Sequence, residues 1–263
     1  MIHPTAYIDP SAELASDVEV GPMAYIGAGC VLHSGVKIGA KATVECYTEI
    51  GEGTMLSPNA HIGGAPQDVS YKGEPTRLKV GKNCIIREFA TMHRASTKED
   101  GITVVGDNGF FMAYSHLAHD CKVGDNVIIA GGSQISGHTQ VGDYVVISGL
   151  VGTHQFSRVG KGAMISALSR SGKDVPPFCT VLNDVIVSLN VVGMRRRGIN
   201  AETRAEIKRA VNILTDKSLL LNDAREKLGE LVQFPEIVEF RNFVNVDSKR
   251  GIIRSASWSN NND

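Results

Sequence analysis

Histidines in the middle of the chain are the side chains best suited to chemistry. His119 is followed directly by Asp120, and Gly137 comes eighteen residues after His119. An imidazole beside a carboxylate is suited to general base catalysis on an alcohol, because neutral imidazole takes up a proton near neutral pH. Gly137 would add a backbone N–H that no side chain obstructs, as an oxyanion donor in acyl transfer. No Ser or Cys occupies a recognisable nucleophile motif, so direct attack by a substrate hydroxyl is the simpler mechanism.

A six-residue repeat must position these groups. An aliphatic residue stands at every sixth position from Ile2 to Ile62, and a small or β-branched residue follows four positions later. Six fits neither the 3.6-residue period of a helix nor the two-residue period of a strand. Short hexapeptide repeats are typical of a parallel β-helix. The pattern continues at Val80–Met92 and again at Val105–Ile165.

The repeat predicts a mainly β protein: a left-handed parallel β-helix over residues 1–192, built as a triangular prism with aliphatic side chains inside. The left hand is taken from the hexapeptide family and is an exception to the right-handed crossover rule. Two segments rich in Gly, Pro or charge, 63–79 and 93–103, interrupt the repeat and are expected to be excursion loops. Residues 193–263 are expected to form a C-terminal α-helical domain that covers the open end of the prism.

Helix signals support this C-terminal domain. Asn200 is a good N-cap for a helix with an apolar stripe. Two more helices are expected at 222–233 and 235–246, the second opened by Pro235.

About eighteen residues per turn would place positions 119, 137 and 155 above one another. Side chains near this column are expected to face outward along a cleft, and the alternative is that they are ordinary surface histidines. The histidines concerned are His116, His119, His138 and His154.

Composition limits the function classes. The net charge is −1, so nothing suggests nucleic-acid binding. No apolar run approaches the roughly 20 residues of a membrane span, and no signal peptide precedes the repeat. The five cysteines are scattered, which indicates reduced thiols and a cytoplasmic location.

Ordered motifs along nearly the whole chain resemble the acyl-[acyl-carrier-protein]:UDP-N-acetylglucosamine O-acyltransferases of lipid A synthesis. These motifs are QDVSYKGEPTR (67–77), HLAHDCKVG (116–124), SGHTQVG (136–142), GTHQF (152–156), DVPP (174–177) and GMRRRGIN (193–200). The resemblance implies a homotrimer with sites between neighbouring prisms. It also implies transfer of a 3-hydroxyacyl group from acyl carrier protein to the 3-hydroxyl of UDP-N-acetylglucosamine, the first step of lipid A synthesis. No metal or cofactor is implied beyond the phosphopantetheine thioester of the carrier protein.

The resemblance also implies a role for each matching residue. His119 would be the general base, Asp120 its orienting carboxylate and Gly137 the oxyanion glycine. Ala167 would lie at the far end of the acyl groove and act as a ruler of chain length. The implied substrate-binding residues are Gln67, Asp68, His116, His138, His154, Gln155, Asn190, Arg196 and Arg197.

One position departs from the family pattern. A Lys usually precedes the Tyr of the Q-D-x-K-Y loop, and here Ser70 precedes Tyr71. A direct ammonium contact from this position is therefore absent, and Lys72 is the nearest candidate to replace it.

Three other functions compete with this hypothesis. A zinc hydratase of the γ-carbonic-anhydrase type also uses histidines on left-handed prisms, but it lacks the helical domain and the QD loop. The related UDP-3-O-acylglucosamine N-acyltransferase carries an additional amino-terminal domain. A purely structural solenoid would need neither loop. The sequence leaves open the acyl length and whether the acceptor presents a 3-hydroxyl or a 3-amino group.

Overall fold

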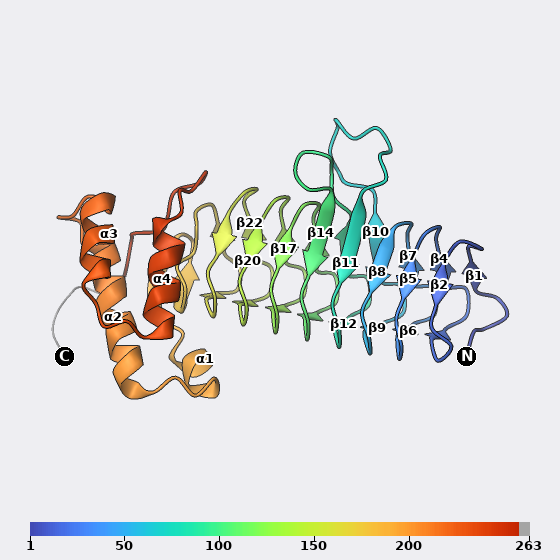
Figure 1. Ribbon diagram of the computed structural model, residues 1–263, viewed down its shortest axis with the longest axis horizontal. Helices are drawn as coiled ribbons and strands as arrows, with labels where there is room; N and C mark the ends of the chain where they lie inside the picture. The colour runs from blue at the N-terminus through green and yellow to red at the C-terminus, as the bar shows by residue number, and fades with distance from the viewer. Residues whose placement is uncertain (258–263) are drawn as a thin grey trace.

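The computed structural model describes residues 1–257 and shows the predicted parallel β-helix. Short strands stack into three flat faces along one long axis, with the helices at the carboxyl end of the prism (Figure 1). The tail 258–263, part of the predicted helical domain, lies outside the described residues.

The first face is a nine-stranded sheet, which we name the histidine sheet after His61 and His116 on its outer surface. Its strands are β1 (Tyr7–Ile8), β4 (Tyr25–Ile26), β7 (Thr43–Val44), β10 (His61–Gly64), β13 (Thr91–His93), β16 (His116–Leu117), β19 (Gln134–Ile135), β22 (Gly152–Thr153) and β25 (Arg170–Ser171).

The second face is an eight-stranded sheet, named the charged sheet because Glu49, Lys79, Lys122 and Arg158 lie on its outer surface. Its strands are β2 (Glu13–Leu14), β5 (Val31–Leu32), β8 (Thr48–Ile50), β11 (Arg77–Val80), β14 (Ile102–Val105), β17 (Lys122–Val123), β20 (Gln140–Val141) and β23 (Arg158–Val159).

The third face is a ten-stranded sheet, named the apolar sheet for the row of apolar side chains on its outer surface. This outer row is Met55, Ile85, Phe110, Ile128, Val146 and Met164. The strands are β3 (Glu19–Val20), β6 (Lys37–Ile38), β9 (Met55–Leu56), β12 (Ile85–Ile86), β15 (Phe110–Phe111), β18 (Ile128–Ile129), β21 (Val146–Ile147), β24 (Met164–Ile165), β26 (Cys179–Leu182) and β27 (Val185–Leu189).

The predicted aliphatic stripe fills the interior of the prism. In the histidine sheet, Leu117 pairs in register with Ile135, and both side chains are at most 1% exposed. The register matters because a slip by one residue would turn the inward side chains to the outer surface. Thr153 is the polar residue of this row, and its Oγ1 accepts a hydrogen bond from the Ser136 N–H at 3.0 Å.

Corners between the strands use the left-handed backbone region. Asp120 and His138 occupy equivalent corner positions in successive coils, with φ of 61° and 60°. Asp and His tolerate this region better than bulky or β-branched residues do.

Two loops leave the prism on the same side (Figure 1). The first loop, residues 65–76, lies between β10 and β11, and the second loop, residues 94–101, lies between β13 and β14. Both are shorter than predicted because the flanking strands extend further into them. Arg94 ties the loops together, since its guanidinium donates to the Gly63 carbonyl at 2.8 Å and to the Tyr71 hydroxyl at 3.0 Å.

The last coil ends in an antiparallel pair, β26 with β27, which the sequence repeat did not predict. The helical domain follows as α1 (Val191–Arg196), α2 (Ala201–Thr215), α3 (Leu221–Gly229) and α4 (Pro235–Asn245). The first helix therefore begins two residues before the predicted boundary at 193.

The predicted start signals of α2 and α4 are confirmed, whereas the helix predicted at 222–233 ends at Gly229. The Asn200 side chain caps α2 by accepting from the Thr203 N–H, and Pro235 opens α4. The predicted apolar stripe of α2, Ile207, Ala210, Val211 and Leu214, is buried. Within residues 1–257, no helix is both long and apolar enough to cross a membrane.

Ile135 tests the packing of the interior. Ile135→Ala should lower the free energy of unfolding by about 2–5 kcal/mol, because the fully buried side chain leaves a cavity that the coil cannot close. The measurement is chemical denaturation at fixed protein concentration. Its neighbour Gln134 is exposed on the outer surface, and Gln134→Ala should change stability by at most about 0.5 kcal/mol. Equal losses from both variants would contradict the packing described here.

Candidate active site

His119 and Asp120 lie at the corner between β16 and β17, where the histidine sheet meets the charged sheet. The His119 Nδ1 is 2.7 Å from Asp120 Oδ2. With Asp120 ionised, Nδ1 carries the hydrogen of this bond, so Nε2 keeps a free lone pair. The side chains are 6% and 0% exposed, so the pair is shielded from bulk water.

The Asp120 carboxylate also holds the second loop. Ser96 donates to Oδ2 through its N–H at 3.0 Å and its hydroxyl at 2.7 Å. Burial raises the pKa of Asp120, but the hydrogen bonds from His119 and Ser96 outweigh burial and hold the pKa below its ordinary value. Asp120 is therefore ionised at neutral pH.

Gly137 lies directly against the His119 ring, one coil further on. A Cβ at Gly137 would come within 3.0 Å of His119 Nε2, so any side chain here would collide with the edge that carries the free lone pair. The eighteen-residue spacing therefore brings these two residues together. Gly137 is buried, and its N–H has no acceptor among residues 1–257.

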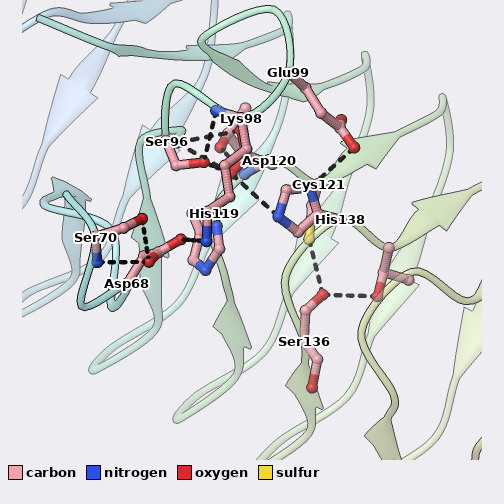
Figure 2. Close-up of polar contacts among 12 residues, drawn as sticks. Asp68, Ser70, Ser96, Lys98, Glu99, His119, Asp120, Cys121, Ser136 and His138 are labelled. Atoms are coloured by element: carbon pink, nitrogen blue, oxygen red, sulfur yellow. Dashed lines mark hydrogen bonds and ion pairs between the residues drawn. The ribbon is translucent and has the colours of Figure 1, made fainter. Parts of the chain in front are cut away.

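His138 is the second imidazole at this corner (Figure 2). Its ring stacks on Phe156 with centroids 4.3 Å apart, and its Nδ1 is 3.0 Å from Glu99 Oε1 on the second loop. The sequence predicted that His119 and His138 face outward. Both do point away from the prism interior, yet both are buried, and Glu99 of the second loop contacts His138.

His116 lies on β16, the strand that precedes the corner with His119. Its Nδ1 is 2.8 Å from the Thr91 hydroxyl, and its ring is edge-on to that of His93, with centroids 4.9 Å apart. Burial is the larger cause that lowers the pKa of both rings, and neighbouring histidines add to it. Sequence reasoning did not single out His93. Its position just after the inward-facing Met92, where the second loop begins, was the available signal.

The first loop contributes Asp68 to this region. Its Oδ1 accepts from the Ser70 N–H and hydroxyl at 2.9 and 2.7 Å, and the Lys98 ammonium is 2.6 Å from Oδ2. Lys98 and Ser70 together hold the pKa of Asp68 well below its ordinary range. Gln67 is exposed beside it.

The remaining predicted residues lie further away. His154 and Gln155 are exposed on the next coil, and the His154 Nδ1 lies 3.1 Å from the Gln155 carbonyl. Ala167 is exposed at a different corner, between the apolar sheet and the histidine sheet, beside Leu168.

Asn190 and Arg197 lie at the third corner, between the charged sheet and the apolar sheet, where both approach Gly162. Asn190 is buried as the N-cap of α1 and also donates to the Gly162 carbonyl, so its amide already has two protein partners. Arg196 is exposed.

Arg197 is more confined. Its guanidinium carbon lies 5.2 Å from the Tyr144 ring centroid and 5.3 Å from that of Phe178. One of its terminal nitrogens is buried and has no hydrogen-bond partner within residues 1–257. Such a nitrogen is an available donor for an anionic oxygen.

One group of potential metal ligands was found within residues 1–257. Ligand atoms of His119, Asp120 and His138 lie within 4.8 Å of one another. Asp120 Oδ2 already accepts from both His119 and Ser96, so these contacts favour a hydrogen-bonded pair over a metal centre.

The pKa of His93, lowered from 6.5 to about 4, predicts a pH effect on stability. Between these values the unfolded chain binds a proton that the folded chain excludes, so stability should fall as the pH drops from 7 to 5. The loss should be about 1 kcal/mol, after an allowance for the partial exposure of the ring. Denaturation at both pH values should show this loss reduced in His93→Asn but not in the exposed control His3→Asn. An unchanged pH dependence in His93→Asn would refute it.

Comparisons with known proteins identify the family. Residues 174–253 match the family described as UDP N-acetylglucosamine O-acyltransferase, domain 2, and residues 102–137 match the bacterial transferase hexapeptide. The acyl-[acyl-carrier-protein]–UDP-N-acetylglucosamine O-acyltransferase of Thermodesulfovibrio yellowstonii is 45% identical over 96% of this chain and 99% of its own length. The corresponding protein of Halorhodospira halophila is 42% identical over the same shares.

Solved structures agree with this. The UDP-N-acetylglucosamine acyltransferase of Bacteroides fragilis is 36% identical, with a TM-score of 0.92 over 97% of this chain and 100% of that chain. The Arabidopsis enzyme is 30% identical, with a TM-score of 0.80 over 96% and 100%. The chain thus belongs to the acyl-[acyl-carrier-protein]–UDP-N-acetylglucosamine O-acyltransferase family.

Proposed function

We propose that this protein transfers a 3-hydroxyacyl group from acyl carrier protein to the 3-hydroxyl of UDP-N-acetylglucosamine, the first step of lipid A synthesis. The observation that carries the proposal is the buried His119–Asp120 pair, whose free Nε2 edge lies against Gly137. A base, an orienting carboxylate and an N–H without a protein acceptor among the described residues are the groups that acyl transfer to an alcohol requires.

The proposed chemistry needs no covalent enzyme intermediate. His119 Nε2 takes the proton of the sugar hydroxyl while its oxygen forms a bond to the thioester carbonyl carbon. Asp120 stabilises the resulting imidazolium, and the Gly137 N–H donates to the oxyanion. The intermediate then expels the phosphopantetheine thiolate, which takes the proton back from His119. No cofactor other than that carried by the acyl donor takes part.

The nucleotide end of the acceptor is assigned to Arg196 and Arg197, since a guanidinium fork suits a diphosphate. Burial lowers the pKa of Arg197, though it stays a cation. This corner of the prism is not the corner that holds His119. A substrate that contacts both corners fits best between two copies of the chain.

A homotrimer is supported by the outer surfaces of the prism. The apolar sheet presents an unbroken outward row from Met55 to Met164, whereas most outward residues of the other two sheets are polar or charged. At the corner beside it, Tyr114, Leu150 and Leu168 are 61–75% exposed. Apolar surface of this extent on a single chain marks a protein contact, and neighbouring copies would cover it.

An acyl groove is supported on the histidine sheet. Gly152 lies on the outer surface of that sheet with open space around its Cα, and the corner that follows the apolar sheet carries Gly131, Gly149 and Ala167 in successive coils. A hydrocarbon chain is proposed to lie along these small residues, with Ala167 at its far end.

The alternatives have less support. The relatives named above are O-acyltransferases. This favours O-acyl transfer over a zinc hydratase, the N-acyltransferase or a structural solenoid. A cytoplasmic location is proposed from the five cysteines, all of them free.

The proposed function is tested by incubating the protein with UDP-N-acetylglucosamine and 3-hydroxyacyl carrier proteins of defined chain length. Mass spectrometry should detect a 3-O-acylated nucleotide sugar, and activity should survive dialysis against a strong chelator. Activity that is lost on chelation and restored by zinc would favour the hydratase instead.

The base is tested by His119→Ala, which should lower turnover by at least ~100-fold, because it removes the imidazole that Asp120 orients. Circular dichroism should show an intact fold. The exposed His33 is the matched control, and His33→Ala should stay within about twofold of wild type. Normal turnover in folded His119→Ala would refute the assignment.

The trimer is tested at Ile128, in the middle of the outward apolar row. Ile128→Asp should convert trimers to monomers, because burying an unpaired carboxylate in an apolar contact is costly. Light scattering measures the mass, with Gln140→Asp on the charged sheet as the control that remains trimeric. A fully active wild-type monomer would contradict the proposed assembly.

The acyl-length ruler is tested at Ala167. Ala167→Met should shift the preference toward chains shorter by about two to four carbons, because each buried methylene contributes about 0.8 kcal/mol. Competition between carrier proteins of two chain lengths should show a selectivity change of roughly tenfold or more. An unchanged profile would exclude Ala167, and Leu168 would be the next candidate.

A further inference from the structure

Lys98, on the second loop, contacts Asp68 on the first loop. Figure 2 shows its side chain directed at Asp68, with Nζ 2.6 Å from Oδ2. The Lys98 side chain is 52% exposed, while that of Asp68 is only 7% exposed. An ammonium is therefore held at the protein surface by a largely covered carboxylate.

The second loop does not need this ion pair to keep its shape. On one side of Lys98, Ser96 is bonded to Asp120, and on the other, the Lys122 ammonium is 2.7 Å from Asp100 Oδ1. The Arg94 contacts hold the two loops together independently. A half-exposed ion pair also contributes little to stability, typically about 0–1 kcal/mol.

The ammonium keeps donor capacity for a ligand. It carries three N–H groups, and within residues 1–257 Asp68 is the one acceptor found for it. Asp68 Oδ1 is already occupied by Ser70, so the carboxylate fixes the ammonium through Oδ2 alone. Asp68 is ionised at neutral pH, because the hydrogen bond from Lys98 is the largest cause that lowers the pKa of this carboxyl group.

The residues beside Lys98 place it next to the catalytic corner. Two residues earlier, Ser96 is bonded to Asp120, the partner of His119. One residue later, the Glu99 carboxylate is 3.0 Å from His138 Nδ1. The second loop thus extends from the corner that holds His119 to Asp68 on the first loop. The Lys98 ammonium lies between these two points.

We propose that Lys98 is a substrate-contacting residue whose ammonium binds an oxygen of the nucleotide-sugar acceptor. This inference rests on the proposed function and deepens it. Ser70 brings no cation to Asp68, and Lys72 is not among the described partners of that carboxylate; the Lys72 N–H instead bonds to Glu74 Oε2 at 2.8 Å. Lys98, from the other loop, supplies the positive charge at this position.

Lys98→Met tests the proposal, since it keeps the length of the side chain and removes the charge. Calorimetric titration with UDP-N-acetylglucosamine should show binding weakened by about tenfold or more, the usual effect of losing a charged hydrogen bond. The KM for the acyl donor and the unfolding temperature should not change. Lys37→Met is the matched control, because Lys37 is equally exposed and paired with a carboxylate, Glu19, far from the site; it should bind the nucleotide sugar like wild type.

A second variant separates charge from loop structure. Ser70 is bonded to the same Asp68 carboxylate, so Ser70→Lys introduces an ammonium beside it from the first loop. Combined with Lys98→Met, it should recover most of the lost affinity. Failure to recover, or a lower unfolding temperature in Lys98→Met, would assign Lys98 a structural role and overturn the proposal.

The inference and the proposed function fail in different ways. If wild-type protein binds UDP-N-acetylglucosamine and Lys98→Met binds it equally well, the inference alone is wrong. If wild-type protein does not bind the nucleotide sugar, both are wrong.

Discussion

The Asp120 carboxylate is the contact on which the rest of the site depends. Its Oδ2 accepts from His119 Nδ1 and from the Ser96 hydroxyl, both at 2.7 Å. One buried anion therefore fixes the tautomer of the base and anchors the loop that covers it. A neutral, non-accepting residue here would leave buried donors unpaired and would release base and loop together.

The prism provides this arrangement because its repeat separates interior from surface. Inward side chains build a continuous core, so outward side chains are not needed for packing and can serve catalysis, binding or assembly. The three faces use that freedom differently: one carries histidines, one carries charges, and one is apolar. The corners hold the reactive groups, since Asp120 and His138 occupy the same left-handed position in successive coils.

Periodic features could be predicted from the sequence. Ile129 and Ile135 lie inside because they keep the six-residue phase, and Gly137 meets His119 because eighteen residues complete one coil. The N-cap at Asn200 is a local signal and was equally readable.

Contacts made by the loops could not be predicted. The Glu99–His138 and Lys98–Asp68 pairs join segments far apart in sequence, through loops that follow no repeat. The same holds for Arg197 between Tyr144 and Phe178. The end of the first loop was also predicted wrongly, because β11, which follows it, has four residues where the repeat predicts two.

A double-mutant cycle on His119 and Asp120 tests the central claim, that this pair acts as one catalytic unit. We would measure kcat/KM for acyl transfer in wild type, His119→Ala, Asp120→Asn and the double variant. If Asp120 acts through His119, the double variant should be no more than about threefold worse than His119→Ala alone. Losses that multiply to the product of the two single losses would show that the residues act independently and would contradict this account.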